Sequence, residues 1–350
     1  MNNQGNFTEP YGLAKYPSNL MKLLIPTRLK RNRGYVAIIV LALIGFGTLP
    51  FYVDVDSFFA YYLFICFVYI ILAQGWNIVA GYTGQISLGS HAFFGLGAYA
   101  TAILWLRDVT HTWYFFDPLV MFLSGLVSAV FAVIIGIPTL SRLRGDYFSF
   151  ATLAAAQVLV ILILRGGKFT QGAMGLRLPG TYFTDMGIYY WTALFLAILA
   201  TAAIYFIIRS RIGLALRAIS EDEVSAASHG IHILWYKLLA FATGAFIMGV
   251  CGSLFAYYLF FVSPSAVLNL NWLFLPILIC ILGGNGTVLG PIIGAFVVGA
   301  LFSYGDVLIG RVHPMLSGIL IILVMKFLPT GLIGLKDRIS PRRRERRAIS

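Results

Sequence analysis

The sequence has 350 residues, of which 59% are hydrophobic and 11% are charged, and its formal net charge is +12. Soluble domains carry about 25% charged residues, and their surfaces need polar cover that this composition does not supply. The composition therefore excludes a soluble fold and predicts an integral membrane protein. Three cysteines lie in separate apolar runs, which favours buried thiols over a disulfide framework or a metal site: Cys66, Cys251 and Cys280.

Apolar runs occur along nearly the whole chain. A membrane helix needs about 20 apolar residues, and only helices and closed barrels satisfy their backbone in lipid. The sequence predicts an all-α, polytopic integral membrane protein of about ten transmembrane helices, with glycine-rich segments that are broken or re-entrant. The predicted spans are residues 35–53, 58–80, 90–106, 118–140, 147–164, 188–208, 237–262, 272–283, 291–310 and 315–333.

Lysine and arginine are distributed unevenly between the connections. If the spans alternate from a cytoplasmic N-terminus, 19 of these residues fall inside and 5 fall in the outer connections. This bias predicts that both termini are cytoplasmic. It divides the chain into a basic N-terminal segment (1–33), a transmembrane domain (34–335) with a long inner connection at 209–237, and a basic tail (336–350). The basic ends are expected to lie against the lipid bilayer, and no nucleic acid binding is expected.

The inner connection contains a predicted short amphipathic helix over residues 218–229. Ser220 is expected to cap it, with Glu223 completing a capping box, and the two acids between them fall in its first turn. Gly230 is expected to end it. Two interpretations stay open, a solvated connector and a docking helix that enters a groove on a partner protein. The residues assigned to the docking interpretation are Ser220, Glu221, Asp222, Glu223, Ala226, Ala227 and Gly230.

Several separately spaced motifs resemble one family of membrane proteins. The inner connection, GLALRAISEDEVSAASHGI, resembles the coupling loop of ABC-transporter permeases, in the form found in branched-chain amino acid importers. The stretches QGWNIVAGYTGQISLG, TQGAMGL, ILGGNGTVLGPIIGA and LPTGLIG are similar to those of the LivM-type permease subunit, over most of residues 60–335. The first 33 residues are unmatched.

The resemblance implies a function and partners. It implies the permease subunit of an ATP-driven importer in the cell inner membrane, which moves leucine, isoleucine or valine delivered by a periplasmic binding protein. The implied partners are a second, LivH-type permease and two ABC ATPase subunits that bind ATP and magnesium. This chain is therefore expected to hold no cofactor and to be no enzyme. A homodimeric pore stays open as an alternative.

Two glycine-rich stretches, GYTGQISLG and GGNGTVLGP, interrupt the apolar sequence. Non-helical backbone at membrane depth is tolerated where it lines a cavity or is buried in protein, and transporters place substrate sites at such breaks. The alternative is close helix packing by small residues. His91 fits either a proton relay or a hydrogen-bonded packing position. The candidate path residues are Gly81, Tyr82, Gly84, Gln85, Ser87, Gly89, His91, Gly283, Gly284, Asn285 and Gly286.

Other function classes have less support in the sequence. A phosphate loop needs GxxxxGK[ST], and no lysine follows GGNGTVLGP, so the chain is not expected to hydrolyse ATP. An ion-coupled secondary transporter usually needs an ionisable residue inside the membrane. The nearest are Asp306 and Lys326, both close to predicted span ends. The same importer machinery could carry other amino acids, urea or short amides.

Overall fold

The computed structural model describes residues 45–49, 54, 57–107, 117–143, 145–178 and 185–309, together with a few positions between 319 and 333. The chain divides into two compact units, Met1–Tyr52 and Val53–Ser350. In the first unit residues 45–49 are described, and they are helical, as expected for part of the predicted span 35–53. All the elements below belong to the second unit.

The second unit is built almost entirely from helices. The long ones are α3 (Phe58–Thr83), α5 (Pro118–Arg142), α6 (Asp146–Arg165), α7 (Met186–Arg209), α10 (Ile233–Leu259) and α13 (Gly290–Ile309). The shorter ones are α4 (Ser90–Leu106), α8 (Arg211–Glu221), α9 (Glu223–Ser228), α11 (Pro264–Val267), α12 (Asn271–Gly283) and the 3-10 turn η1 (Gly172–Met174). Each predicted span between residues 58 and 310 contains a helix, which confirms that part of the prediction.

Six helical segments in the described part of the chain are long and apolar enough to cross a membrane. They are α3, α5, α6, α7, α10 and the stretch Pro264–Gly283, which contains α11 and α12. The segments Ser90–Leu106 and Gly290–Gly305 are apolar but shorter. The all-α, polytopic character is thus confirmed. The total of about ten spans and the cytoplasmic termini stay predictions, because residues 315–333 and both ends lie largely outside the described residues.

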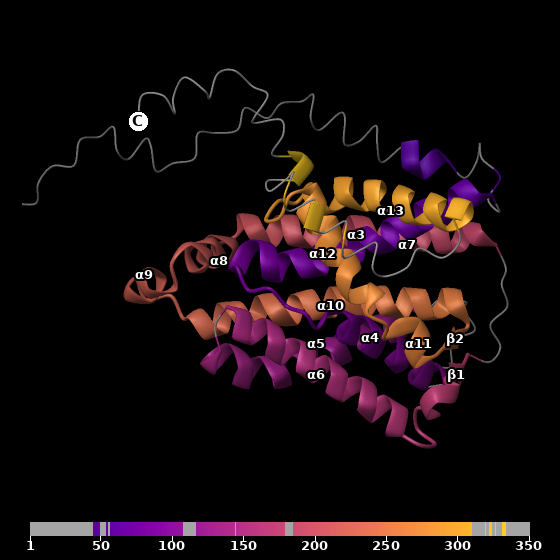
Figure 1. Ribbon diagram of the computed structural model, residues 1–350, viewed down its shortest axis with the longest axis horizontal. Helices are drawn as coiled ribbons and strands as arrows, with labels where there is room; N and C mark the ends of the chain where they lie inside the picture. The colour runs from indigo at the N-terminus through magenta and orange to yellow at the C-terminus, as the bar shows by residue number, and fades with distance from the viewer. Residues whose placement is uncertain are drawn as a thin grey trace, which may run out of the picture. The chain divides into compact units, whose positions relative to one another are not determined.

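α3 is the central element of this unit. Its apolar window is 100% buried, whereas 33% of the corresponding window is buried in α6 and in α7. Helices α7, α10, α12 and α13 all pack against α3 (Figure 1). A helix that is enclosed on every side must find partners inside the protein for any polar side chain that it carries. The polar side chains of α3 therefore determine which backbone segments lie beside it.

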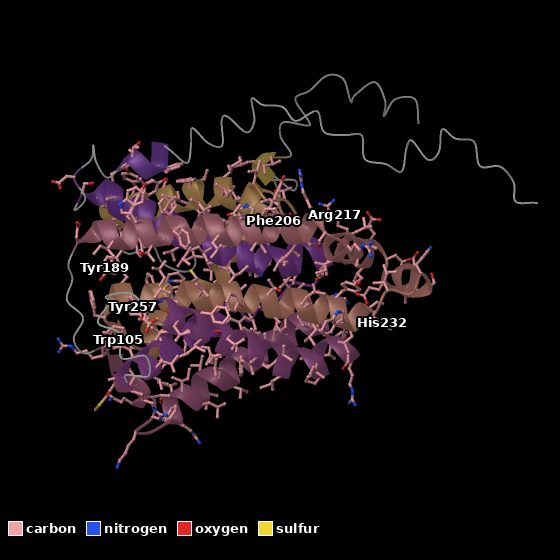
Figure 2. The ribbon with its side chains drawn as sticks, turned by 180° about the vertical axis from the view of Figure 1, so that it is seen from behind. Trp105, Tyr189, Phe206, Arg217, His232 and Tyr257 are labelled. Atoms are coloured by element: carbon pink, nitrogen blue, oxygen red, sulfur yellow. The ribbon has the colours of Figure 1, made fainter. Side chains whose placement is uncertain are left out.

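The unit has two distinct ends. One carries α8 and α9, and the other carries two short strands, β1 (Leu176–Arg177) and β2 (Phe261–Val262) (Figure 1). Figure 2 shows Arg217 and His232 at the α8–α9 end, whereas Trp105, Tyr189 and Tyr257 lie at the opposite end. α10 extends between the two ends and contacts α3, α4 and α5 along the way.

The two strands connect distant parts of the chain. β1 and β2 pair in antiparallel fashion, with Leu176 opposite Val262. The long connection after α6 is thereby joined to the chain that leaves α10. Among the described residues, this two-stranded sheet is the departure from the all-α prediction.

Candidate functional site

The first glycine-rich break is a non-helical segment, residues 84–89, between α3 and α4. Gly84 follows the end of α3 with a φ of 70°, a left-handed conformation that suits glycine because it has no Cβ to collide. The chain then folds back along α3, since the Trp76 indole Nε1, about two turns before the helix end, donates to the Ser87 carbonyl at 2.9 Å. Gly89 leads into the first turn of α4.

α6 satisfies further backbone groups of this segment. The Ser149 hydroxyl donates to the Ile86 carbonyl at 2.6 Å, and the Leu88 amide donates to the Thr152 hydroxyl at 3.0 Å. Buried backbone polar groups need such partners when they leave a helix. Sequence reasoning missed Trp76, Ser149 and Thr152. The available signal was the pair of hydroxyls three residues apart in the apolar run FSFATLAAA.

The second glycine-rich break, residues 284–289, is held by two amide side chains of α3. Asn77 donates from Nδ2 to the Thr287 carbonyl at 2.9 Å and accepts from the Gly286 amide at 3.0 Å. Gln74 donates from Nε2 to the Val288 carbonyl at 2.9 Å. The connection between α12 and α13 is therefore fixed to the central helix. Sequence reasoning missed both amides, although two amides in the apolar stretch QGWN are a signal for buried polar partners.

The two breaks approach each other at the end of α3. A Cβ on Gly81 would lie 2.6 Å from the Gly286 amide nitrogen and 2.8 Å from its Cα, so the approach requires glycine at position 81. Gly283, the last residue of α12, packs against the first residue of α13. Gly284 follows as the C-cap of α12, and Asn285 is exposed in the turn. Close packing thus accounts for Gly81, Gly283 and Gly286.

The prediction of one helix over residues 218–229, capped by Ser220, is wrong. Two helices, α8 and α9, meet at Asp222, whose carboxylate accepts from the Val224 amide at 2.9 Å and so caps α9. Ser220 lies in the last turn of α8, because that helix continues along the buried side chains Leu216 and Ile219. Aspartate is as good an N-cap as serine, so the boundary moves by two residues.

The start and end of the connection also change. Glu221 ends α8 instead of lying in the first turn of a helix, and Glu223 begins α9 without a capping box to Ser220. Gly230 follows α9 with a φ of 80°, and its amide donates to the Ala227 carbonyl at 2.9 Å, which confirms the predicted C-terminal glycine. α10 begins at Ile233, so the connection is shorter than the predicted 209–237 and its last residue lies inside a helix.

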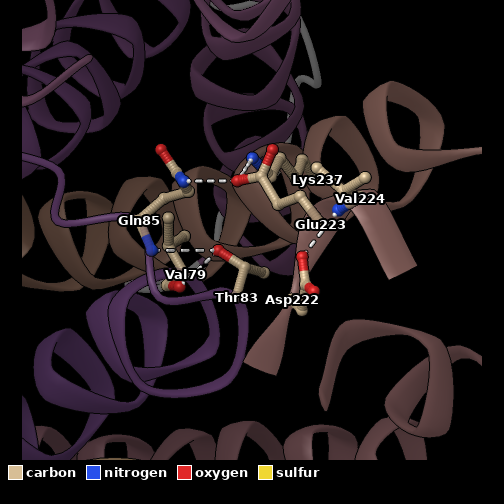
Figure 3. A network of polar contacts seen from close by, with 7 residues as sticks. All are labelled: Val79, Thr83, Gln85, Asp222, Glu223, Val224 and Lys237. Atoms are coloured by element: carbon tan, nitrogen blue, oxygen red, sulfur yellow. Dashed lines mark hydrogen bonds and ion pairs between the residues drawn. The ribbon is translucent and has the colours of Figure 1, made fainter. Parts of the chain in front are cut away.

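Glu223 is directed into the protein (Figure 3). Its Oε1 forms an ion pair with the Lys237 ammonium of α10 and accepts a hydrogen bond from the Gln85 side-chain Nε2 at 3.2 Å. The Lys237 side chain is 2% exposed and that of Glu223 is 21% exposed. The backbone amide of Gln85 donates to the Thr83 hydroxyl at 3.3 Å. The first break, α9 and α10 therefore meet in one polar network.

The outer face of α9 is exposed. Val224 is 70% exposed, as is Leu214 on α8 at 72%. Ala227 is also exposed, whereas Ala226 is buried, so the two alanines do not share one surface. Sequence reasoning did not single out Val224 or Leu214. The residues of the connection that are also exposed are Ser220, Glu221, Asp222 and Gly230.

The remaining path candidates have different surroundings. Tyr82 is buried in the last turn of α3, with the Arg217 guanidinium carbon 6.0 Å from its ring centroid. The Ser87 hydroxyl accepts from the Gly89 amide at 3.3 Å. His91, in the first turn of α4, is 0% exposed, and neither ring nitrogen has a partner among the described residues. The hydrogen-bonded packing position predicted for His91 is therefore not observed in this part of the chain.

Comparison with known proteins identifies the family. A family model described as branched-chain amino acid transport system / permease component matches residues 58–325. The chain belongs to this permease family. It is 32% identical over 257 residues to the high-affinity branched-chain amino acid transport system permease protein LivM of Salmonella typhimurium, covering 65% of this chain and 59% of that protein. It is 28% identical over 316 residues to LivM of Escherichia coli, covering 81% and 70%.

A second type of relative is more distant. The permease is 24% identical over 295 residues to LivH of Salmonella typhimurium, covering 76% of this chain and 91% of that protein. The permease spans 59% of the length of the Salmonella LivM protein. No solved structure matches it significantly. Family membership and the six long apolar helices together indicate a multi-pass membrane protein.

Proposed function

We propose that the chain is the permease subunit of an ATP-driven importer and that it moves leucine, isoleucine or valine delivered by a periplasmic binding protein. The family match over residues 58–325 and the LivM relatives support the substrate class. The observation that carries the ATP-driven part is α9, a capped helix that is exposed on one face and bonded to the first break on the other. ATP hydrolysis is assigned to separate ATPase subunits, so this chain itself is no enzyme.

In the proposed arrangement the permease lies in the cell inner membrane with about ten spans and both termini cytoplasmic. The α8–α9 end then faces the cytoplasm, and the β1–β2 end faces outward. The lysine and arginine bias supports this orientation. The basic segments 1–33 and 336–350 then lie against anionic lipid of the inner leaflet.

The proposed partners correspond to these two ends. Val224 and Leu214 present apolar side chains from short helices, which suits recognition in a groove on one of two ABC ATPase subunits. The outer connection, residues 165–187, contacts the binding protein. A second, LivH-type permease completes the pore. Similarity to LivM and LivH proteins supports this pairing over a homodimer.

We place the amino acid path at the start of α4. This helix begins without a side-chain cap, and the partial positive charge of its N-terminus suits a carboxylate. His91 lies in the same turn, buried and with no partner for its ring nitrogens among the described residues. We expect His91→Leu to raise the KM for leucine uptake by about tenfold through the loss of one hydrogen bond to a charged group. His91→Gln, which keeps a donor, is the matched control, and an unchanged KM in both variants places the path elsewhere.

The decisive experiment is radiolabelled leucine uptake into proteoliposomes. The chain is supplied with its candidate permease partner, both ATPases and the binding protein, and then with each one omitted. Uptake that requires ATP and every component supports the proposal. Uptake by this chain alone on a proton gradient contradicts it and favours the ion-coupled alternative, in which Asp306 and Lys326 become the residues to test. ATP-dependent uptake of urea or glutamate but not leucine changes the substrate and keeps the machinery.

A further inference from the structure

The first break is connected to α9 through side chains. We propose that Lys237, Glu223 and Gln85 form a polar link that transmits the movement of α9 to residues 84–89 and, through them, to α4. The inference rests on the proposed function in one respect, that an ATPase subunit moves α9. It assigns Lys237 and Gln85 as positioning residues for coupling, and it gives Glu223 an internal role instead of an ATPase contact.

Lys237 requires its partner. A buried ammonium without a counter-charge is strongly unfavourable, and removing one partner of a buried ion pair leaves the other uncompensated. Lys237 is 2% exposed, and Glu223 is the carboxylate paired with it. The pair joins the first residue of α9 to the second turn of α10. α9 is thus attached to the long helix α10 by an ion pair.

Gln85 extends this attachment to the break. Its Nε2 donates to the same Glu223 oxygen at 3.2 Å, and its side chain is buried, so the bond is partly shielded from water. Gln85 is the second residue of the non-helical segment 84–89. A displacement of Glu223 therefore acts on a segment that has no helical hydrogen bonds of its own and is held by single side-chain bonds to α3 and α6.

The segment connects Gln85 to the start of α4. Its residues Ile86 and Leu88 are bonded to α6, and Gly89 leads directly into α4 and His91. A chain of bonded groups thus runs from α9 to the start of α4, where the amino acid path is proposed. The two faces of α9 thus have separate roles, since Val224 is exposed for the ATPase while Glu223 is bonded inside.

The test compares uptake with ATP hydrolysis in the same reconstituted importer. Gln85→Leu removes the bond from the link without leaving a buried charge. We expect ATP hydrolysis and ATPase-subunit binding at the wild-type level, while leucine transported per ATP falls by about tenfold or more, as for coupled sites. Gln157→Leu, the same change at an exposed position of α6, is the matched control. A wild-type transport ratio in Gln85→Leu overturns the link.

A charge exchange guards against a variant that simply fails to fold. Glu223→Lys places two cations together and is expected to abolish uptake. The double variant Glu223→Lys/Lys237→Glu restores the ion pair, and the Gln85 amide can turn so that its oxygen accepts. Recovery of uptake in the double variant, and its loss again when Gln85→Leu is added, is the expected pattern. Equal uptake with and without Gln85→Leu in that background contradicts the link.

A readout without partners separates this inference from the proposed function. Hydrogen exchange of the purified chain in detergent reports on residues 84–89 directly. We expect Gln85→Leu to accelerate exchange there and to leave β1 and β2 unchanged. Unchanged exchange at 84–89 refutes the link, whatever the substrate. Wild-type importer that shows no ATP-dependent uptake refutes the proposed function instead, while the exchange result still decides the link.

Discussion

The two glycine-rich breaks have loosely similar sequences but different attachments. Residues 284–289 are bonded to Gln74 and Asn77 of α3, the most enclosed helix. Residues 84–89 also touch α3, through Trp76, but their other bonds go to α6 and α9 at the periphery. We therefore expect the break bonded to the core to stay fixed, and the break bonded to peripheral helices to follow their movement. Glycine content thus indicates where a helix is interrupted, whereas the side chains bonded to the interruption determine which helices it follows.

The point where the breaks meet should be the most sensitive to substitution. Gly81→Leu places side-chain atoms where the Gly286 backbone lies, and backbone cannot move aside as a flexible side chain can. We expect little or no folded protein in the membrane fraction, measured by detergent size-exclusion chromatography. Ala154→Leu, the same added bulk at an exposed position of α6, is the control. Normal yield of Gly81→Leu would show that the breaks are not in close contact.

The attachment of the second break should affect stability. Asn77→Leu removes two hydrogen bonds to residues 284–289 at similar side-chain volume, and we expect a loss of about 1–3 kcal/mol in unfolding free energy. Thermal unfolding in detergent measures it. Asn285→Leu, an exposed position of the same break, should cost much less. The amount of leucine transported per ATP should stay normal in the Asn77→Leu protein that still folds. A fall in that amount would contradict the distinction between the two breaks.

The attachment of the first break should affect coupling more than stability. Thr152→Val keeps the side-chain shape and removes the acceptor of the Leu88 amide, so we expect a loss of about 1 kcal/mol, typical of such bonds in membranes. Leucine transported per ATP should fall as well, because the segment loses one of its two bonds to α6 and can then absorb a displacement of Gln85 before it reaches α4. Thr192→Val, which removes a hydroxyl bond within α7 at a half-buried position, is the comparison. A variant that loses stability but keeps its transport ratio contradicts this assignment.

The smallest effect on uptake should come from the cap of α9. Asp222→Ala removes the bond to the Val224 amide, and N-cap losses cost about 0.5–2 kcal/mol of helix stability. The expected result is faster hydrogen exchange in α9 and a modest fall in uptake. Ser220→Ala should leave α9 exchange unchanged, since Ser220 belongs to α8. If Ser220→Ala accelerated exchange in α9 more than Asp222→Ala did, Ser220 would be the cap, as the sequence predicts.

Much of the fold could be predicted from the sequence because apolar length is a local property. The spans from 58–80 to 291–310 each contain a helix, and both breaks fall where glycines accumulate. The cap at Asp222 was missed because Ser220 and Asp222 are equally good caps, and only the burial of Leu216 and Ile219 against other helices extends α8 past the serine.

The bonds of the site could not be predicted in the same way. Ser149 and Thr152 lie 63 or 64 residues from their partners, and Asn77 lies about 210 residues from the second break. From the sequence, Lys237 contributes only to the charge bias that predicts topology, because a single sequence does not show which carboxylate it pairs with. A six-residue helix is also too short for periodicity to reveal that Glu223 is internal and Val224 external.

The length of α10 has a consequence for the coupling between the two ends of the unit. It has 27 residues and is therefore about 40 Å long, with β2 beyond one end and Lys237 near the other. A partner that binds the two-stranded sheet and tilts α10 is expected to shift the Glu223–Lys237 ion pair at the other end of that helix. If the proposed partners bind at these two ends, thermodynamic linkage requires that each one alters the affinity of the other by the same factor.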